Sequence, residues 1–364
     1  MQLLVLAAGI GKRFQPLVTS KPLLPFLGKT LLEHVVANCQ GLKPSQIIIV
    51  VNPKDKTAVA KLFPKAKIVV QPAPNGMAGA VLSARLDLVG PTVVVNGDDW
   101  IDPKIIQQFS RAIKTTPDKV IFTGIKSHPG LTGGFFSLQG QSLQVIEKPA
   151  EGKEPSEWLK IVLDYFPKIE EFIAVLKADY EAGLNQLTNS LLVKAAGKFY
   201  QLKYPWQILD LTAGLLTGKS IIDKTAKIYP GAQIINSYIG PKVIIGHHCL
   251  IRDSIIESGT TVGYYTEIAR SYVGPNNFFH TNYVGDSIIE GGSNLGSGAR
   301  LANMRFDKKE VLPGKSKLGA ILAKGSQLGI NSSVMPGVTL GAKALLASGL
   351  VLYQSLSAGE FKKT

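Results

Sequence analysis

The sequence is poor in cysteine and has no long hydrophobic run. Its two cysteines, Cys39 and Cys249, lie far apart among 364 residues, which gives neither a disulfide framework nor the CxxC spacing of a metal site. The first apolar stretch, QLLVLAA (2–8), has no basic start and is too short for a signal peptide or a membrane span, and no later apolar run reaches membrane length. We therefore expect a reduced, cytoplasmic protein without a membrane partner.

Negative charge is also scarce, because 26 Asp and Glu residues stand against 40 Lys and Arg residues, a formal net charge of +14. Such an excess favours anionic partners. The lysines are scattered singly, and the sequence has neither an arginine-rich run nor an RNA-stacking or helix-turn-helix signature. Phosphorylated small molecules therefore fit better than nucleic acid, and a merely basic, solvated surface is the remaining interpretation.

The first part of the chain, residues 1–218, alternates short apolar strands with amphipathic stretches. One such stretch, TLLEHVVANCQGL (30–42), has apolar residues three and four positions apart and a helix stop at Gly41. Strands that are continuous Val and Ile runs are typical of a parallel sheet that helices cover on both faces. We therefore predict an open α/β domain whose strands include 2–8, 46–51, 67–71, 92–97 and 119–125.

The second part, residues 219–364, has a repeating aliphatic residue six positions apart, often followed by glycine, with occasional five-residue steps such as Ile234 to Ile239. A period of six fits neither a helix nor a hairpin and is typical of a hexapeptide β-helix. Residues 303–317, NMRFDKKEVLPGKSK, interrupt the period and are predicted to form a loop that serves a ligand or a neighbour. The repeat positions are Ile222, Ile228, Ile234, Ile239, Ile245, Ile251, Ile256, Val262 and Ile268, and then Leu322, Leu328, Val334, Leu340, Leu346 and Leu352.

A glycine-rich turn follows the first strand, with the spacing Gly9-x-Gly11-x-Arg13. Glycines let backbone N–H groups approach phosphate oxygens closely. The spacing is neither the dinucleotide pattern GxGxxG nor a P-loop. Two cations on the same segment, Arg13 and Lys21, could neutralise charge on a triphosphate.

The stretch LAAGIGKRFQPLVTSKPLLPFLGKTLLEHV (6–35) resembles the signature of sugar-1-phosphate nucleotidyltransferases. The resemblance continues in order through QPAPNG (71–76), NGDD (96–99), the glycine pair 133–134, VIEKP (145–149) and YPWQILDLTAGLL (204–216). It implies a Rossmann-like (GT-A-type) domain in which a sugar 1-phosphate displaces pyrophosphate from a nucleoside triphosphate, by positioning and charge neutralisation.

The resemblance also implies roles for single residues. Arg13 would stabilise the departing pyrophosphate, and Lys21 the α-phosphate or the sugar phosphate. Gln71 and Gly76 would contact the pyrimidine of UTP or dTTP, and Asp98 would hold Mg²⁺. The turn residues Ala8, Gly9 and Gly11 would bind the nucleotide, and Gly134, Glu147 and Lys148 would contact the sugar and its phosphate.

Each of these assignments has a plainer alternative. Asp98 could cap the next helix, the adjacent Glu147 and Lys148 could form a surface ion pair, and Gln71, before a proline, could be a loop residue.

Two departures from the family pattern bear on the reaction. In FYQLKYPW (199–206), Gln201 replaces the aspartate that is the second metal ligand, and Lys203 replaces a glycine. A neutral amide is a poorer Mg²⁺ ligand than a carboxylate, so Lys203 could supply positive charge instead. The sugar-binding NTG segment is also absent, and WLKIVLDYF (158–166) stands in its place.

The β-helix sequence resembles the acetyltransferase half of the bifunctional, archaeal-type glucosamine-1-phosphate acetyltransferase and N-acetylglucosamine-1-phosphate uridylyltransferase. The matching segments are FFHTNYVGDSII (278–289), GSGARLANMRFDKKEV (296–311) and KLGAILAKGSQLGINSSVMPGV (317–338). The resemblance implies that acetyl-CoA binds in a groove between neighbouring β-helices, and hence a homotrimer or a dimer of trimers.

The resemblance implies that His280 is the general base that accepts a proton from the glucosamine amine, a task that suits a pKa near neutrality. The alternative is a histidine that only completes a solenoid corner. Arg300 and Leu312 depart from the family's threonine and lysine and could alter the acceptor. The other implied roles are positioning of the sugar phosphate and amine by Tyr283 and Asn303, phosphate binding by Arg270 and Lys309, and a groove lined by backbone at Ala299 and Ala320.

The sequence therefore predicts a two-domain enzyme that makes UDP-N-acetylglucosamine or a close relative. Two alternatives remain open. One is a uridylyl- or thymidylyltransferase whose β-helix serves only assembly, and the other is a regulatory subunit that binds nucleotide sugars without turnover, which Gln201 would favour.

Overall fold

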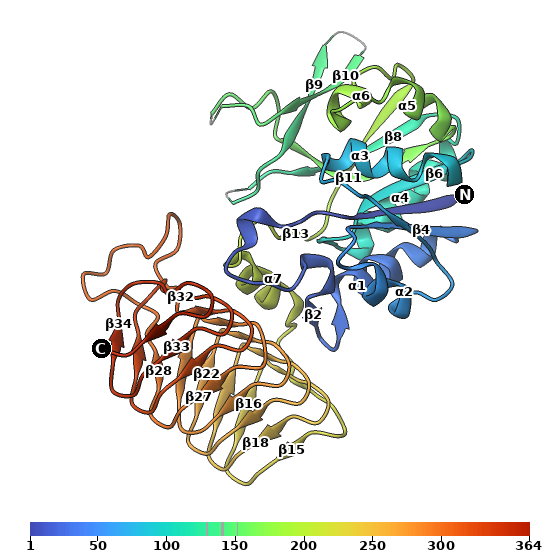
Figure 1. Ribbon diagram of the computed structural model, residues 1–364. Helices are drawn as coiled ribbons and strands as arrows, with labels where there is room; N and C mark the ends of the chain where they lie inside the picture. Colours follow the sequence, from blue (N-terminus) through green and yellow to red (C-terminus); the bar gives the residue numbers. More distant parts are fainter. Residues whose placement is uncertain (129, 140–141, 151) are drawn as a thin grey trace. The chain divides into compact units, whose positions relative to one another are not determined.

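The computed structural model describes residues 1–128, 130–139, 142–150 and 152–364 (Figure 1). These residues group into two units. The first unit comprises Met1–Ile10 and Leu31–Gln201, and the second comprises Gly11–Thr30 and Leu202–Thr364. Residues 11–30, which follow the first strand, thus group with the β-helix. The domain boundary predicted between residues 218 and 219 stays a prediction.

The first unit is built on a nine-stranded mixed sheet with the order β10-β9-β11-β6-β1-β4-β5, in which β8 pairs with β11 and β12. The neighbouring strands β6, β1, β4 and β5 are parallel, as the Val and Ile runs predict. The strands are β1 (Gln2–Ala7), β4 (Gln46–Val51), β5 (Lys67–Val70), β6 (Thr92–Asn96), β8 (Val120–Lys126), β9 (Gly134–Gln139), β10 (Ser142–Glu147), β11 (Trp158–Phe166) and β12 (Ser190–Ala195).

The sheet differs from the predicted parallel one beyond β6. Strand β11 is antiparallel to β6, β8 and β9, and it is the segment WLKIVLDYF that stands in place of the family's NTG motif. Beside the main sheet, β7 (Asp99–Ile101) pairs with β13 (Phe199–Gln201) in an antiparallel ribbon.

Helices flank this sheet. The expected helix over 30–42 is α1 (Leu31–Cys39), which passes into a short 3₁₀ turn that contains Gly41. One face carries an apolar cluster to which the sheet residues Leu4 and Leu6 contribute together with Val81 of α3 and Phe172 of α5. The other helices of the unit are α2 (Lys56–Leu62), α3 (Gly76–Ser83), α4 (Pro103–Thr115), α5 (Ile169–Val175) and α6 (Tyr180–Leu184).

The second unit contains α7 (Gln207–Leu215), a hairpin of β2 (Pro25–Phe26) and β3 (Lys29–Thr30), and a left-handed parallel β-helix whose three sheets stack coil upon coil (Figure 1). One sheet holds β14 (Ile221–Ile222), β17 (Tyr238–Ile239), β20 (Ile255–Ile256), β23 (Tyr272–Val273), β26 (Ile288–Ile289), β29 (Ile321–Leu322) and β32 (Thr339–Leu340). The next holds β15 (Lys227–Ile228), β18 (Ile244–Ile245), β21 (Thr261–Val262), β24 (Phe278–Phe279), β27 (Asn294–Leu295), β30 (Gln327–Leu328), β33 (Leu345–Leu346) and β35 (Phe361–Lys362). The third holds β16 (Gln233–Ile235), β19 (Leu250–Arg252), β22 (Glu267–Ala269), β25 (Tyr283–Gly285), β28 (Arg300–Leu301), β31 (Ser333–Val334) and β34 (Val351–Leu352).

The repeat residues from Ile239 onward form the buried core of the solenoid, as the six-residue period predicts. The first coil differs, since Ile222 and Ile228 are 46% and 38% exposed. This coil has a neighbour on one side only, so its aliphatic side chains are not enclosed. The predicted loop at 303–317 leaves the solenoid between β28 and β29 (Figure 1), and Lys315 Nζ in it donates to Asp210 Oδ1 of α7 at 2.7 Å.

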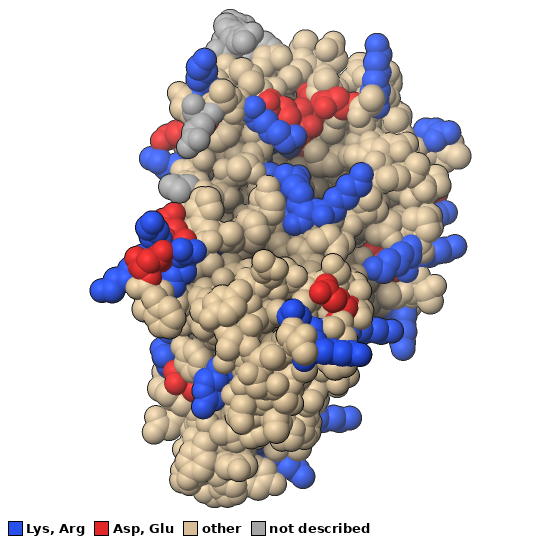
Figure 2. All heavy atoms as spheres, turned by 60° about the vertical axis from the view of Figure 1, so that its left-hand side comes forward, with Lys and Arg blue, Asp and Glu red and all other residues tan. Residues whose placement is uncertain are grey.

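Charged side chains in the described part of the chain do not form one continuous patch on the visible face of the protein. Figure 2 shows Lys and Arg side chains in several separate groups on the visible face, with uncharged residues and some Asp and Glu between them. Within the described residues, no helix is both long enough and apolar enough to span a membrane.

Candidate functional site

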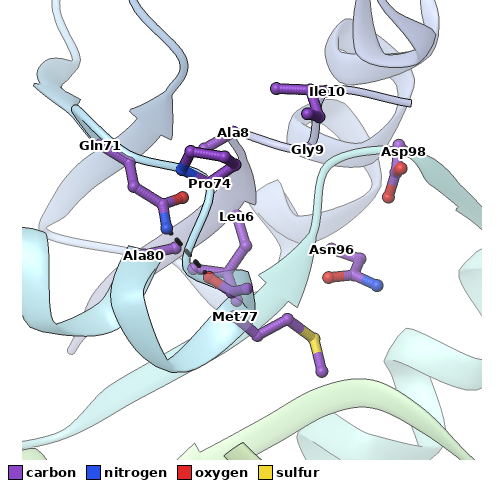
Figure 3. A pocket seen from close by; sticks show the side chains of 11 residues that line it. Leu6, Ala8, Gly9, Ile10, Gln71, Pro74, Met77, Ala80, Asn96 and Asp98 are labelled. Atoms are coloured by element: carbon purple, nitrogen blue, oxygen red, sulfur yellow. Dashed lines mark hydrogen bonds between the residues drawn. The ribbon is translucent and has the colours of Figure 1, made fainter. Parts of the chain in front are cut away.

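A hollow of about 270 Å³ opens in the first unit where the parallel strands β1 and β6 end (Figure 3). In open α/β sheets, ligands bind beyond the carboxyl ends of the strands. The lining brings together Ala8, Gly9, Gln71, Gly76 and Asp98, which the sequence assigns to the nucleotide from three separate segments. The remaining lining residues are Leu6, Ile10, Pro74, Met77, Ala80 and Asn96.

The Gln71 amide is held in a fixed orientation at this hollow. The side chain is 5% exposed, and its Nε2 donates to the carbonyl oxygen of Gly76 at 3.1 Å (Figure 3). Gly76 begins α3 with a φ of 75°, a conformation that glycine adopts without steric cost. Gly79, one turn later, leaves room for the amide, since a Cβ there would lie 2.8 Å from Gln71 Nε2. Glycines therefore shape the pocket around a preoriented amide.

The two predicted metal ligands come from neighbouring elements. Asp98 lies in the turn between β6 and β7, and the β7–β13 register sets Gln201 opposite Asp99, the next residue. Gln201 Oε1 is buried and has no hydrogen-bond partner among the described residues. An unpaired buried acceptor is costly, and a hard cation binds amide and carboxylate oxygens. The residues therefore fit a divalent cation that takes its other ligands from phosphates. Within the described residues, no group of three or more His, Cys, Asp or Glu side chains is placed to hold a metal.

The predicted sugar-phosphate residues of the first unit also lie together. The β9–β10 register pairs Gly134 with Glu147, and a Cβ at Gly134 would lie 3.1 Å from Glu147 Oε2. Lys148 Nζ lies 2.9 Å from Glu147 Oε1, with side chains 67% and 35% exposed. Glu147 and Lys148 are exposed and Gly134 is buried, and none of the three is part of the lining of the hollow.

A buried ion pair in β11 is a feature that sequence reasoning missed. Lys160 and Asp164 are 2% and 0% exposed, with Nζ and Oδ2 2.8 Å apart, and Tyr180 Oη donates to Asp164 Oδ2 at 2.9 Å. The signal was available, since both charges interrupt the apolar strand WLKIVLDYF four residues apart and so share one face of it.

The remaining predicted nucleotidyltransferase residues belong to the second unit. Gly11 has a φ of 62° and precedes a 3₁₀ turn that carries Arg13. The Arg13 guanidinium lies 5.8 Å from the centroid of the Tyr204 ring. Lys203 donates its backbone N–H to Gln207 Oε1 at 2.6 Å. Lys21 begins a second 3₁₀ turn, Lys21–Leu23.

In the β-helix, two predicted acetyltransferase residues bind an acidic residue, and a third contacts one of the two. Arg270 makes a bidentate pair with Asp286, with Nε and Nη2 each 2.7 Å from a carboxylate oxygen. These hydrogen bonds raise the pKa of Arg270. Asn303 Nδ2 donates to the same carboxylate, and Tyr283 Oη donates to Asn303 Oδ1 at 3.5 Å. The motif GD at 285–286 carries Asp286, but sequence reasoning gave it no role.

The other predicted acetyltransferase residues lie outside this network in the described chain. His280 is exposed at a solenoid corner, with its ring 5.0 Å from that of Phe278, and Lys309 is exposed in the loop. Ala299 and Ala320 have fully buried side chains in the solenoid core. Both residues are 0% exposed with their backbone included.

Comparison with known proteins adds to this geometry. A bifunctional sugar-1-phosphate nucleotidylyltransferase/acetyltransferase of Sulfurisphaera tokodaii is 27% identical over 424 aligned residues, which cover 100% of both chains. The bifunctional protein GlmU of Methanocaldococcus jannaschii is 27% identical over 99% of this chain and 97% of its own, and that of Listeria monocytogenes is 23% identical over 95% and 91%.

A family model described as a MobA-like NTP transferase domain matches residues 3–191, more than half of the 364 residues. The match spans the whole lining of the hollow and the strands that carry it. The chain therefore belongs to the MobA-like NTP transferase family.

Proposed function

We propose that the protein transfers a nucleotidyl group from UTP or dTTP to a sugar 1-phosphate, and that its β-helix uses acetyl-CoA to N-acetylate glucosamine 1-phosphate, so that together they make UDP-N-acetylglucosamine. The observation that carries the first half is the hollow, where five residues assigned to the nucleotide meet. The relatives align over nearly the whole chain, and their names support both proposed reactions.

In the proposed first reaction, a phosphate oxygen of the sugar 1-phosphate attacks the α-phosphorus of the nucleotide. The bond from the α-phosphorus to the bridging oxygen breaks, and pyrophosphate leaves. The protein supplies position and positive charge. Gln71 would hydrogen-bond the pyrimidine edge, the backbone of Ala8, Gly9 and Gly11 would approach the phosphates, and Arg13 and Lys21 would neutralise them.

Asp98 and Gln201 would hold Mg²⁺, which supplies charge neutralisation at the phosphates when it is bound. Gly134, Glu147 and Lys148 would bind the acceptor, with the Lys148 ammonium on its phosphate, and Lys203 would add positive charge beside Gln201.

In the proposed second reaction, the glucosamine nitrogen attacks the thioester carbonyl of acetyl-CoA, and coenzyme A leaves as the thiol. His280 would accept the amine proton, which its exposed imidazole at a solenoid corner allows. The network of Tyr283, Asn303 and Asp286 would orient the amine, and Arg270 and Lys309 would bind the phosphate. Backbone at Ala299 and Ala320 would line the acetyl-CoA groove between subunits of a homotrimer or a dimer of trimers, in the cytoplasm.

The experiment measures pyrophosphate release with Mg²⁺. UTP, dTTP, ATP and GTP are each combined with glucose 1-phosphate, N-acetylglucosamine 1-phosphate and glucosamine 1-phosphate, the last with and without acetyl-CoA. We expect release with UTP or dTTP that is lost in Asp98→Ala and kept in Asp118→Ala, a control in the loop between α4 and β8. Glucosamine 1-phosphate should react only with acetyl-CoA present, and in His280→Ala it should not react even then.

The alternatives give different results. Release that never depends on acetyl-CoA, with unreactive glucosamine 1-phosphate, would restrict the chain to nucleotidyl transfer. Nucleotide binding without release from any pair would contradict the proposal and identify a binding subunit, which Gln201 in place of a carboxylate would explain.

A further inference from the structure

Two glutamates in the β-helix occupy positions where several other coils of the same sheet have glycine. Glu257 and Glu290 follow the core residues at the ends of β20 and β26, whereas Gly240 and Gly274 follow those of β17 and β23 in the same sheet. Their exposed fractions are only 1% and 4%. Burying a carboxylate costs free energy unless its oxygens receive hydrogen bonds, so these side chains must have a specific partner.

Most of their hydrogen bonds come from the backbone of the N-terminal segment 11–30, and one comes from the β-helix itself. Glu290 Oε1 accepts from the N–H of Val18 at 3.0 Å and from that of Thr19, and its Oε2 accepts from Lys324 N at 2.8 Å. Glu257 Oε2 accepts from Gly28 N at 3.2 Å. Each of these bonds pairs a main-chain N–H group with a buried carboxyl oxygen, and either group would be costly to leave unpaired. The two glutamates therefore anchor the segment at two places.

Tyrosines of the same sheet add to these anchors. Tyr272 Oη donates to the carbonyl oxygen of Pro25 at 2.8 Å, and its ring lies 5.2 Å from that of Phe26. Tyr238 lies so close to Gly28 that a Cβ on this glycine would be 2.6 Å from Tyr238 Oη. The hydroxyl groups and carboxylates of four successive strands, β17, β20, β23 and β26, thus contact one stretch of main chain. These contacts explain why residues 11–30 group with the β-helix.

Lys21 lies between the anchors, two residues after Thr19 and four before Pro25, in the 3₁₀ turn Lys21–Leu23. Arg13 lies earlier on the same segment, five residues before Val18. Hydrogen bonds to main-chain groups fix the backbone conformation of a segment, whatever its side chains contact. The anchors therefore fix the main chain on both sides of Lys21, and they begin five residues after Arg13.

We propose that Glu257 and Glu290 are positioning residues for nucleotidyl transfer, which hold segment 11–30 so that Arg13 and Lys21 meet the triphosphate in one conformation. This inference rests on the proposed function. It makes the β-helix a part of the nucleotidyltransferase machinery and more than a carrier of a second active site.

The kinetic test uses Glu257→Ala and Glu290→Ala in the full-length chain. The matched control is Glu267→Ala, which removes a half-exposed glutamate of β22 that pairs with Arg252 at 3.0 Å. Because misplacing catalytic groups by about 1 Å can cost about 100-fold in rate, we expect the KM for UTP to rise and kcat to fall, each about tenfold. The KM for the sugar 1-phosphate and all constants of the control should stay within about twofold of the original values.

A double-mutant cycle tests whether the glutamates act through the cations. In a background that carries both Arg13→Ala and Lys21→Ala, Glu290→Ala should change the KM for UTP by less than about twofold, since residues that act as a unit are not additive. Loss of folded protein lowers apparent kcat without moving the KM for UTP. If Glu290→Ala does not fold, Glu290→Gln keeps the volume and turns one acceptor into a donor that faces an N–H group, and the same expectations apply.

Amide hydrogen exchange reads the anchoring without any activity. The amides of Val18, Thr19 and Gly28 should exchange at least about tenfold faster in the alanine variants and at the original rate in Glu267→Ala. Unchanged exchange and unchanged kinetics would overturn the inference, as would faster exchange with unchanged kinetics. If the unmodified chain releases no pyrophosphate, the proposed function fails and the positioning role with it. If the unmodified chain releases pyrophosphate and the glutamate variants release it with the same kinetic constants, only the positioning role is overturned.

Discussion

The buried ion pair of Lys160 and Asp164 allows a quantitative prediction about the first unit. Lys160 Nζ donates to both Asp164 oxygens, at 3.1 and 2.8 Å, and to the carbonyl oxygen of Ile161 at 3.2 Å. The donors of this ammonium therefore have partners, and both side chains are almost completely buried. Removing one partner of such a pair leaves a charge in a medium that solvates it poorly.

We expect Asp164→Leu to lower the free energy of unfolding by about 3–5 kcal/mol, because it leaves the Lys160 ammonium buried without its counter-ion. Lys160→Met should cost less, because burial already raises the pKa of Asp164 and a protonated carboxyl needs no counter-ion. The double variant Lys160→Met with Asp164→Leu should be more stable than Asp164→Leu alone, since no charge stays buried. Domains are stable by about 5–15 kcal/mol, so these differences are large.

Urea unfolding followed by tryptophan fluorescence measures these changes, since Trp158 begins the same strand. The control is Lys126→Met, which removes an exposed partner of Glu157, and it should change stability by less than about 1 kcal/mol. The reasoning is refuted if the effects of the two substitutions add in the double variant, because additivity would mean that the charges do not interact.

Three further predictions concern single positions. Burial raises the pKa of Glu257 from 4.5 to about 7, so the folded state binds a proton more tightly than the unfolded state. The free energy of unfolding should therefore fall by about 3 kcal/mol as the pH rises from about 4.5 to about 7. Glu257→Gln should lose this pH dependence in thermal unfolding between pH 5 and pH 8, and an unchanged dependence would contradict the assignment. Gly285→Ala should lower acetyl transfer and leave nucleotidyl transfer intact, because its Cβ would lie 2.7 Å from Tyr283 Oη and 2.8 Å from Asn303 Nδ2; equal loss of both activities would point to misfolding instead. Gln201→Asp should lower the Mg²⁺ concentration that gives half-maximal pyrophosphate release, because a carboxylate binds this cation better than an amide, and an unchanged requirement would remove residue 201 from the metal site.

Several features of this protein follow from local sequence. The six-residue period requires a β-helix, because a side chain that must point inward once per short strand can be buried only in a solenoid. The Val and Ile runs likewise require strands covered on both faces. The motifs at Gly9, Gln71 and Asp98 each follow a strand of the parallel sheet, and parallel strands end at one edge, so their meeting in one hollow was predictable.

Tertiary structure decided what depends on contacts between distant residues. The repeat predicts that Ile222 is buried, yet it is exposed because no coil precedes it. Lys160 and Asp164 become a pair only because strand β11 is enclosed by its neighbours. The attachment of segment 11–30 to Glu257 and Glu290 spans more than 200 residues of chain. No periodicity or motif encodes such a contact, because it arises only when main-chain donors and buried carboxylates that are remote in sequence are brought within hydrogen-bonding distance by the fold.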